Sequence, residues 1–414
     1  MAWRVSRIYI CICIADINTA TADWEKVSEQ ANKDVADALD NSADKTKELT
    51  DESENLKDMI NDEVIPAIED ELEAAGIRTF GPRKNAAILE GSKAFSKDLM
   101  KKYNIPTAAF EIFDNAEDAL KYLETAPIPT VVKADGLALG KGVIIAMTRE
   151  EAVEAVKSIM EDKIFGESGN NIVIEEFLTG PEVSVLSFTD GNIVVPMISS
   201  MDHKRALDND EGLNTGGMGT IAPNPYYTED IAKECMEKIF VPTINAMKAE
   251  GRTFKGCLYF GLMLTPNGPK VIEYNCRFGD PETQVVLPLL ESDLLDIMIA
   301  VENESLTEDM VKFSDKSACC VVMASKGYPV KYESGFKISV DDDFDDNLYI
   351  AGAKLNGDDV VTAGGRVLGV VAVENDLVTA IEKSYLSVKK VHFDNAFYRN
   401  DIGAKALKVL KEGK

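Results

Sequence analysis

Residues 271–284 read VIEYNCRFGDPETQ, an apolar strand that runs directly into a group of polar side chains. Glu273 and Asn275 stand two apart in this strand, so both side chains project from the same face. Carboxylate and amide oxygens in this arrangement suit Mg²⁺, which prefers hard oxygen ligands. Arg277 follows them and can clamp an anion. Because such residues around Gly-Asp-Pro are poor core material, the stretch predicts a functional site at a strand end.

A glycine-rich hairpin lies upstream, where residues 131–143 read VVKADGLALGKGV. Lys133 ends a strand and Lys141 lies within the hairpin. Glycines let backbone N–H groups approach phosphate oxygens, and the lysines supply positive charge. The stretch is not a Walker A loop, because no Gly-Lys-Ser/Thr opens a helix. A tight hairpin with two solvated lysines is the alternative to phosphate contact.

Two further stretches have the composition of binding elements. Residues 172–182 read IVIEEFLTGPE, a strand whose end can offer backbone groups to a purine edge and a carboxylate to ribose hydroxyls. Solvent-exposed acids at a strand end are the commoner explanation of such a pattern. The strings DHKR at 202–205 and NTGGMG at 214–219 are typical of a flexible loop that closes on a substrate. Within it, His203 is expected to be a hydrogen-bond donor or structural residue rather than a general base.

Composition excludes several classes of protein. The 414 residues are enough for several domains, and the net charge of −27 would repel a nucleic-acid backbone. No window approaches the roughly 18 consecutive apolar residues that a membrane span needs. The seven cysteines form no CxxC pair and lie mostly in apolar runs, which indicates reduced, buried thiols in a cytoplasmic protein. We therefore expect no nucleic acid and no membrane among its partners.

The chain divides into a glycine-free front and a mixed α+β remainder. No glycine precedes Gly76, and the acidic stretch 16–60 predicts one or two weakly amphipathic helices after an opening strand. A single helix is expected over 85–103 and a long one from 228 to about 250. Short strands and helices otherwise alternate, which favours several α+β domains over one doubly wound sheet. The expected strands are 108–113, 130–134, 143–147, 172–177, 183–189, 193–199, 256–264, 269–275, 318–324, 348–354 and 365–373, and the other expected helices are 116–124, 149–161 and 378–388.

Taken together and in this order, these stretches resemble the ATP-grasp superfamily, and within it the phosphoribosylamine–glycine ligases, also called glycinamide ribonucleotide synthetases. The resemblance runs from about residue 62 to the C-terminus, and several of its strings are particular to this ligase. Another ATP-grasp carboxylate–amine ligase is an alternative that the string at 277–284 disfavours. The matching strings are FGP at 80–82, LEGSKAF at 89–95, KADGLALGKGV at 133–143, DHKR at 202–205, NTGGMG at 214–219 and EYNCRFGDPETQ at 273–284.

The resemblance implies an α/β and α+β multidomain protein with an ATP-grasp fold. An atypical, incomplete N-terminal α/β domain would span residues 1–92. The ATP-grasp domain would span 93–308, with a lid subdomain at about 113–188, and a C-terminal α+β domain would span 309–414. The partners would be the small molecules glycine, phosphoribosylamine and ATP, and the ligase would act as a cytoplasmic monomer.

The resemblance also implies a two-step reaction in purine synthesis. The glycine carboxylate attacks the γ-phosphate of ATP, and the amine of 5-phospho-β-D-ribosylamine then displaces phosphate to give glycinamide ribonucleotide. Such chemistry needs positioning and charge neutralisation rather than a nucleophilic side chain. The ATP-binding residues would be Lys97 and Lys133 at the phosphates, Gly140, Lys141 and Gly142 in the closing glycine-rich loop, Glu175, Phe177 and Leu178 around the adenine, and Glu182 at the ribose. The ligands of Mg²⁺ or Mn²⁺ would be Glu273 and Asn275. The substrate-binding residues would be Asp202, Lys204, Asn214, Thr215, Gly216, Gly217, Arg277, Asp280 and Glu282, and the catalytic residues Arg277, Lys204 and Lys141.

The front of the chain departs from the family pattern. The family normally opens with a strand that leads into a Gly-Arg-Glu-His turn, and has Pro-Gly-Asn-Ala-Gly and Gly-Pro-Glu turns before the point that matches Phe80; none of them occurs here. These turns are expected to help bind phosphoribosylamine. Their loss favours, as an alternative function, a nucleotide-binding ATP-grasp protein with impaired or no ligase activity.

Overall fold

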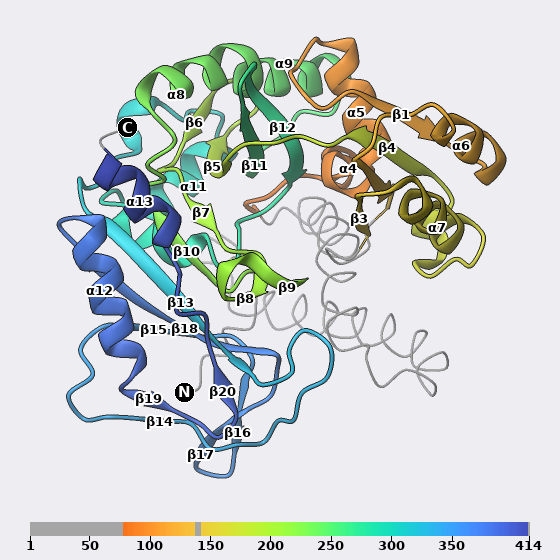
Figure 1. Cartoon of the computed structure of the whole chain (residues 1–414). Helices are drawn as coiled ribbons and strands as arrows, with labels where there is room; N and C mark the ends of the chain where they lie inside the picture. The colour runs from red at the N-terminus through yellow and green to blue at the C-terminus, as the bar shows by residue number, and fades with distance from the viewer. Residues whose placement is uncertain (1–77, 137–141, 413–414) are drawn as a thin grey trace, which may run out of the picture.

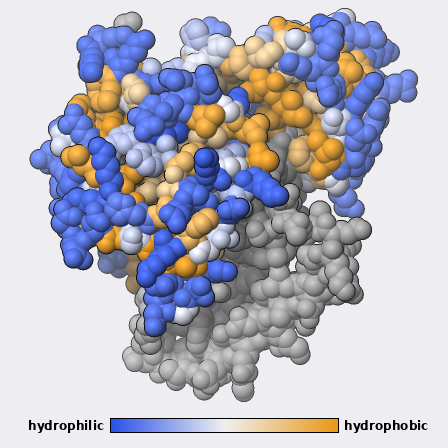
Figure 2. All heavy atoms as spheres, turned by 60° about the horizontal axis from the view of Figure 1, so that its bottom comes forward, coloured by the Kyte–Doolittle hydropathy of each residue, from blue (hydrophilic) through white to orange (hydrophobic). Residues whose placement is uncertain are grey.

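The computed structural model describes residues 78–136 and 142–412, which form three main β-sheets with helices packed against them (Figure 1). The expected acidic helices over 16–60 and most of the expected N-terminal domain lie outside the described residues. Figure 2 shows hydrophilic residues interspersed with apolar ones over the described part of one face. No helix within the described ranges is long and apolar enough to cross a membrane.

The first sheet, here called the lid sheet, has four antiparallel strands in the order β1-β4-β2-β3. An apolar cluster joins it to its two helices, which lie beside it at the right of Figure 1. The second of these helices begins with a reciprocal capping box, because Thr148 and Glu151 each accept a hydrogen bond from the other's backbone N–H. The elements are β1 (Phe110–Phe113), α6 (Ala116–Leu123), β2 (Thr130–Ala134), β3 (Val143–Ala146), α7 (Arg149–Met160), a 3₁₀ turn (Gly166–Gly169) and β4 (Ile172–Glu176).

The second sheet, the central sheet, is also antiparallel, in the order β12-β11-β5-β6. Its helices cover one face around Phe240 and Phe260, whose ring centroids lie 4.2 Å apart. In Figure 1 two of them run across the top of the sheet. The elements are α4 (Lys84–Gly91), α5 (Lys93–Lys102), β5 (Glu182–Thr189), β6 (Val194–Pro196), α8 (Glu229–Cys235), a π-helical turn (Met236–Phe240), α9 (Val241–Ala249), β11 (Gly256–Thr265) and β12 (Gly268–Asn275).

The third sheet follows the order β15-β18-β13-β10-β7, with β20 beside β13. Every residue of β13 is buried, because one of its faces packs towards the central sheet and the other towards α12. The elements are β7 (Met201–Asp202), β10 (Gly219–Ala222), α10 (Thr283–Val286), α11 (Leu294–Glu302), β13 (Ser317–Ser325), β15 (Asn347–Ile350), β18 (Arg366–Glu374), α12 (Leu377–Val388), β20 (Ala396–Phe397) and α13 (Ala404–Glu412).

Three two-stranded pairs complete the architecture, and one of them bears on the site. The hairpin β8–β9 follows Lys204 and ends at Asn214. The pairs are β8 (Arg205–Leu207) with β9 (Glu211–Asn214), β14 (Ser339–Val340) with β19 (Val391–His392), and β16 (Ala353–Asn356) with β17 (Asp359–Thr362). The remaining short 3₁₀ turns are Asp208–Asp210, Leu287–Leu289 and Glu308–Met310.

As expected, the chain forms several separate sheets with helices against them rather than one doubly wound sheet, and β2 has the expected bounds. The expectation of one helix over 85–103 is wrong. The chain is extended at Ser92 (φ −136°, ψ 114°), whose hydroxyl accepts a hydrogen bond from the Phe95 N–H and so starts a second helix. The cysteines at 235, 257, 276, 319 and 320 are buried thiols without disulfides, as expected, whereas Cys11 and Cys13 lie outside the described residues.

Candidate active site

The site lies where the lid sheet meets the central sheet. Lys133 is the next-to-last residue of β2 in the lid sheet, and its Nζ lies 3.2 Å from the carbonyl oxygen of Ile272 in β12. The loop after β4, which carries Phe177 and Leu178, leads directly into β5 of the central sheet. Both of these side chains are half-buried. The polar residues of the site therefore lie where the chain passes from the lid sheet to the central sheet.

Two buried lysines share one carboxylate at this junction. Oε1 of Glu175 lies 3.1 Å from Nζ of Lys97 and 3.0 Å from Nζ of Lys133, and all three side chains are at most 6% exposed. Lys97 also donates a 2.7 Å hydrogen bond to Thr107. Burial lowers the pKa of Lys97 to about 8, although Glu175 acts in the opposite direction. Two cations against one anion leave a positive excess, which suits a phosphate ligand.

Lys93 is a third lysine of this region that the sequence analysis did not single out. It stands at the start of α5, one turn before Lys97, and its Nζ donates to the carbonyl of Gly136 at 3.0 Å. Burial is the main cause that lowers its pKa, followed by the nearby charge of Lys133, whereas Glu273 acts in the opposite direction. The signal that could have found it is its i, i+4 spacing from Lys97, on a helix that Ser92 caps.

The two candidate metal ligands lie on the edge strand β12, in register with β11. Partial burial favours the neutral form of Glu273, but the positive charges of Lys204, Lys133 and Lys93 outweigh this effect and lower the pKa of the carboxyl group. Glu273 is therefore an anion at neutral pH. Glu273 and Asn275 together supply hard oxygen donors of the kind that Mg²⁺ accepts beside substrate phosphates and water. Within residues 78–136 and 142–412, no group of three or more His, Cys, Asp or Glu side chains could hold a metal ion alone.

Arg277 is fixed beside these ligands by Glu90, another residue that the sequence analysis did not assign. Nε of Arg277 lies 3.1 Å from Oε1 of Glu90, and its Nη2 donates to Oδ1 of Asn275 at 3.3 Å. The same Glu90 carboxylate accepts a hydrogen bond from the Cys276 N–H. Helix α4 thus orients the residue that we expected to clamp an anion.

Lys204 lies between the residues expected to bind the nucleotide and those expected to bind the other substrates. Its Nζ lies 3.3 Å from Oε2 of Glu182 and 3.6 Å from Oε1 of Glu273, and about a third of its side chain is exposed. Glu182, at the start of β5, has the largest influence on the pKa of Lys204 and raises it, and Glu273 and Asp202 act in the same direction. The ammonium group therefore remains charged between the predicted ribose ligand and the predicted metal ligand.

A buried acidic group lies next to Lys204. Glu282 is 4% exposed, and its Oε1 accepts a hydrogen bond from the Tyr259 hydroxyl at 3.1 Å. Burial raises the pKa of Glu282. Burial, followed by the negative charge of Glu282, raises the pKa of Asp202 well above its usual range. Burial and the repulsion between the carboxylates of Glu282 and Asp202 therefore favour a proton on this pair.

The loop after β9 packs against the same acids. The Thr215 N–H and hydroxyl both donate to the carbonyl of Lys204, at 2.7 and 2.9 Å. A Cβ on Gly217 would lie 2.4 Å from Cδ of Pro281 and 2.7 Å from Oδ1 of Asp202, so this position has room only for glycine. The side chain of Asn214 is exposed at the end of the hairpin.

His203 is structural, as expected. It is buried, its Nδ1 lies 3.0 Å from the carbonyl oxygen of Gly219, and its Nε2 accepts a hydrogen bond from the Gly403 N–H at 3.1 Å. Burial, followed by the charge of Arg399, lowers the pKa of His203 to about 4. A ring that is neutral and bonded at both nitrogens has no position left for a substrate proton.

The structure thus brings together most of the expected residues from the lid sheet, β12, the 202–217 region and the 277–284 turn. Lys141 and Gly140 lie outside the described residues. Gly142 is described, and its carbonyl accepts a hydrogen bond from the Ala134 N–H at 2.8 Å. Asp280 is held by Arg366, which comes from the third sheet and carried no local signal in the sequence.

Two family models match the chain. The model described as phosphoribosylglycinamide synthetase, ATP-grasp (A) domain, matches residues 91–283. The model described as phosphoribosylglycinamide synthetase, C domain, matches residues 318–405. Together these ranges include the lid sheet, the central sheet and most of the third sheet.

Individual relatives agree with the family models. A curated phosphoribosylamine–glycine ligase from Fusobacterium nucleatum is 48% identical over 345 residues, which cover 82% of this chain and 81% of the relative. The crystal structure of phosphoribosylamine–glycine ligase from Thermotoga maritima has a TM-score of 0.72 at 36% identity, covering 78% of this chain and 81% of that one. The biotin carboxylase domain of Hydrogenobacter thermophilus 2-oxoglutarate carboxylase shares the fold alone, with a TM-score of 0.63 at 17% identity and coverage of 80% and 73%.

Proposed function

This chain belongs to the phosphoribosylamine–glycine ligase family of ATP-grasp enzymes, and we propose that the site described above is where it ligates glycine to phosphoribosylamine. The enzyme is an ATP-dependent carbon–nitrogen ligase of purine biosynthesis. The observation that carries the assignment to this site is Lys204, whose ammonium group lies against both Glu182 and Glu273. One residue there connects the nucleotide half of the site to the substrate half.

We assign the nucleotide to the junction of the lid and central sheets. Lys97 and Lys133 would neutralise phosphate oxygens, with Lys93 as a third cation on the same side. Gly140, Lys141 and Gly142 would close over the phosphates. Phe177 and Leu178, half-buried between the two sheets, would frame the adenine, and Glu182 at the start of β5 would accept bonds from the ribose hydroxyls.

The family resemblance places Glu175 beside the adenine, but its carboxylate lies against two lysines. It balances the charge of Lys97 and Lys133, so we propose that its side chain sets the position of these two ammonium groups. Any contact of residue 175 with the adenine would then come from its backbone. This division of roles between side chain and backbone fits β4, whose first four side chains, that of Glu175 included, are buried and whose end adjoins the loop to β5.

We propose that Glu273 and Asn275 hold Mg²⁺ or Mn²⁺. The divalent ion, when bound, would neutralise charge that develops on the phosphate oxygens. Glu273 is suited to the role because three lysines keep it ionised. Arg277, which Glu90 and Asn275 orient, would stabilise the acyl phosphate of glycine.

The chemistry follows from positioning. In the first step an oxygen of the glycine carboxylate bonds to the γ-phosphorus of ATP and ADP leaves. In the second step the amine nitrogen of phosphoribosylamine bonds to the glycyl carbonyl carbon, phosphate leaves with the C–O electron pair, and the amine gives up a proton. Lys204, Arg277 and Lys141 would stabilise negative charge, and Asp202, Asp280, Glu282 and the loop 214–217 would bind the two substrates.

Three broader assignments complete the proposal. We divide the chain at residues 92 and 308, with the lid subdomain at about 113–188, and place the ligase in the cytoplasm as a monomer. The five buried thiols of the described chain support a reducing compartment. Sedimentation of the purified protein tests the monomer.

The experiment that tests the function measures ADP release with Mg-ATP and both substrates, in the whole chain and in Lys204→Met. We expect substrate-dependent release from the wild type and at least a hundredfold lower kcat from the variant, since it loses a charge at the junction of the site. Unchanged turnover in Lys204→Met would contradict the location of the site, although not the activity itself.

A further inference from the structure

Arg366, at the start of β18, contacts the substrate side of the site from the third sheet. Its side chain is 6% exposed, and Nη1 donates to the carbonyl oxygens of Gly216 at 2.6 Å and Gly217 at 3.3 Å. Nη1 also lies 3.0 Å from the carbonyl oxygen of Asp280, and Nη2 lies 3.2 Å from Oδ2 of that residue. One guanidinium therefore joins the loop 214–217 to the turn that follows β12.

Tyr328, which also lies near the third sheet, holds the same loop through the backbone N–H of Gly216. The Gly216 N–H donates to the Tyr328 hydroxyl at 3.2 Å, while the Gly216 carbonyl accepts from Arg366. A Cβ on Gly216 would lie 2.8 Å from Cζ of Arg366, so the loop backbone packs directly on the guanidinium. The loop is thus placed between Arg366 on one side and Asp202 with Pro281 on the other.

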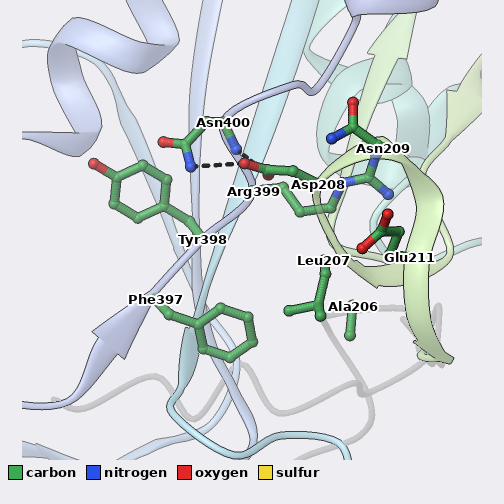
Figure 3. A pocket seen from close by; sticks show the side chains of 9 residues that line it. All are labelled: Ala206, Leu207, Asp208, Asn209, Glu211, Phe397, Tyr398, Arg399 and Asn400. Carbon is green, nitrogen blue, oxygen red and sulfur yellow. Dashed lines mark hydrogen bonds between the residues drawn. The ribbon is translucent and has the colours of Figure 1, made fainter.

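The far end of the hairpin β8–β9 is held by the same C-terminal part of the chain. Asn400 donates from its backbone N–H and its Nδ2 to Asp208, at 2.7 and 3.0 Å, as Figure 3 shows for the side chain. Arg399 pairs with Asp210 at 3.0 Å and donates to the carbonyl of Arg205 at 3.1 Å. The hairpin that connects Lys204 to Asn214 is therefore anchored at its tip, and Arg366 anchors the loop that follows it.

We propose that Arg366 is a positioning residue of the ligase. It holds the loop 214–217 and Asp280 in the geometry that binds glycine or phosphoribosylamine, without touching either substrate itself. The proposal rests on the proposed function. The planar guanidinium can serve three carbonyl oxygens and a carboxylate at once, whereas a lysine ammonium has three donors and no fixed plane. The side chain is buried and directed at backbone groups, so it acts through the loop.

The test compares Arg366→Lys and Tyr328→Phe with the wild-type chain. For Arg366→Lys we expect kcat/KM for glycine or phosphoribosylamine to fall at least tenfold, while the dissociation constant of Mg-ATP stays within twofold. Tyr328→Phe removes the hydrogen bond from the Gly216 N–H and keeps the ring, so it should show a smaller fall of the same kind. Amide hydrogen exchange of the fragment 212–219 should rise in Arg366→Lys, while exchange in β16–β17 stays unchanged.

The matched control is Lys383→Met. Lys383 lies on α12, which packs on the same sheet, and its ammonium group pairs with Asp346 at 3.2 Å and with Glu374, at the opposite end of β18 from Arg366, at 3.1 Å. Its kinetic constants should match the wild type. A parallel loss of ATP binding in Arg366→Lys, or constants within twofold of the wild type, would overturn the proposal. If the wild type makes no product, the proposed function fails, and the exchange of 212–219 still decides whether Arg366 holds the loop.

Discussion

Nζ of Lys204 lies 3.6 Å from Oε1 of Glu273, although one residue follows a short strand of the third sheet and the other belongs to the edge strand of the central sheet. The contact places a cation of the substrate loop against the carboxylate that we assign to the metal. It also explains why Glu273 remains ionised despite partial burial, since Lys204 is the strongest of the three lysines that lower its pKa.

Glu273→Ala should abolish ligation, with kcat reduced at least a hundredfold. The change removes an oxygen ligand and leaves the charges of Lys204, Lys133 and Lys93 without this partner. ADP formation under saturating Mg-ATP and both substrates measures the effect. Glu234→Gln removes a partly exposed carboxylate of α8 that pairs with Lys238 in the following π-helical turn, and it should change kcat by less than twofold. A Glu273→Ala enzyme as active as this control would exclude Glu273 as a metal ligand.

Binding of ATP should take up protons at about pH 8.5. In the ligand-free protein burial lowers the pKa of Lys97 to about 8, so at this pH its amine is largely neutral. A phosphate nearby favours the charged form and raises that pKa, which draws a proton from the buffer. Calorimetry in buffers of different ionisation enthalpy measures the uptake. Lys97→Met should lose most of it, and Lys238→Met should keep it; uptake that persists in Lys97→Met would show that another group titrates.

The free energy of unfolding should decrease as the pH falls from about 6.5 to about 4, in part because of His203. Its folded pKa of about 4 lies below the value of the unfolded chain, so the unfolded chain binds more protons over this interval. The contribution of this one group is about 3 kcal/mol. Urea unfolding of His203→Gln at pH 7 and pH 4.5 should show a smaller pH dependence than the wild type, and an identical dependence would contradict the buried neutral ring.

Gly217→Ala should lower both stability and activity. Gly217 has φ +111°, and the added Cβ would meet Pro281 at 2.4 Å, so the loop must move away from Asp202. We expect a loss of at least about 2 kcal/mol and a tenfold lower kcat/KM. Gly251→Ala is the control, because Gly251 has φ +70° but open space around it and should cost only about 1 kcal/mol. Equal effects of the two substitutions would mean that backbone strain alone is responsible.

The sequence could predict those parts of the site that depend on local pattern. Strand 130–134 has the predicted bounds because a run of Val and Thr ends in a turn, and the spacing of Glu273 and Asn275 placed both on one strand. The break at Ser92 was missed because a helical pattern continues on both sides of it. The hydroxyl that caps α5 decides the break.

The residues that support the site could not be predicted from local pattern. Glu90 orients Arg277, and Arg366 holds Gly216, across long separations in sequence. Such pairs form only when separate sheets pack together, and no spacing within one segment indicates them. The same holds for Glu175, whose place between two lysines follows from the approach of α5 to the lid sheet.

The central claim is tested most directly by ADP release from the purified chain with Mg-ATP and glycine, with and without freshly generated phosphoribosylamine. The account predicts ADP release that depends on both substrates, and one glycinamide ribonucleotide formed for each ADP. Thermal protection by Mg-ATP without any release of ADP would contradict it, and would favour a nucleotide-binding protein that lacks ligase activity.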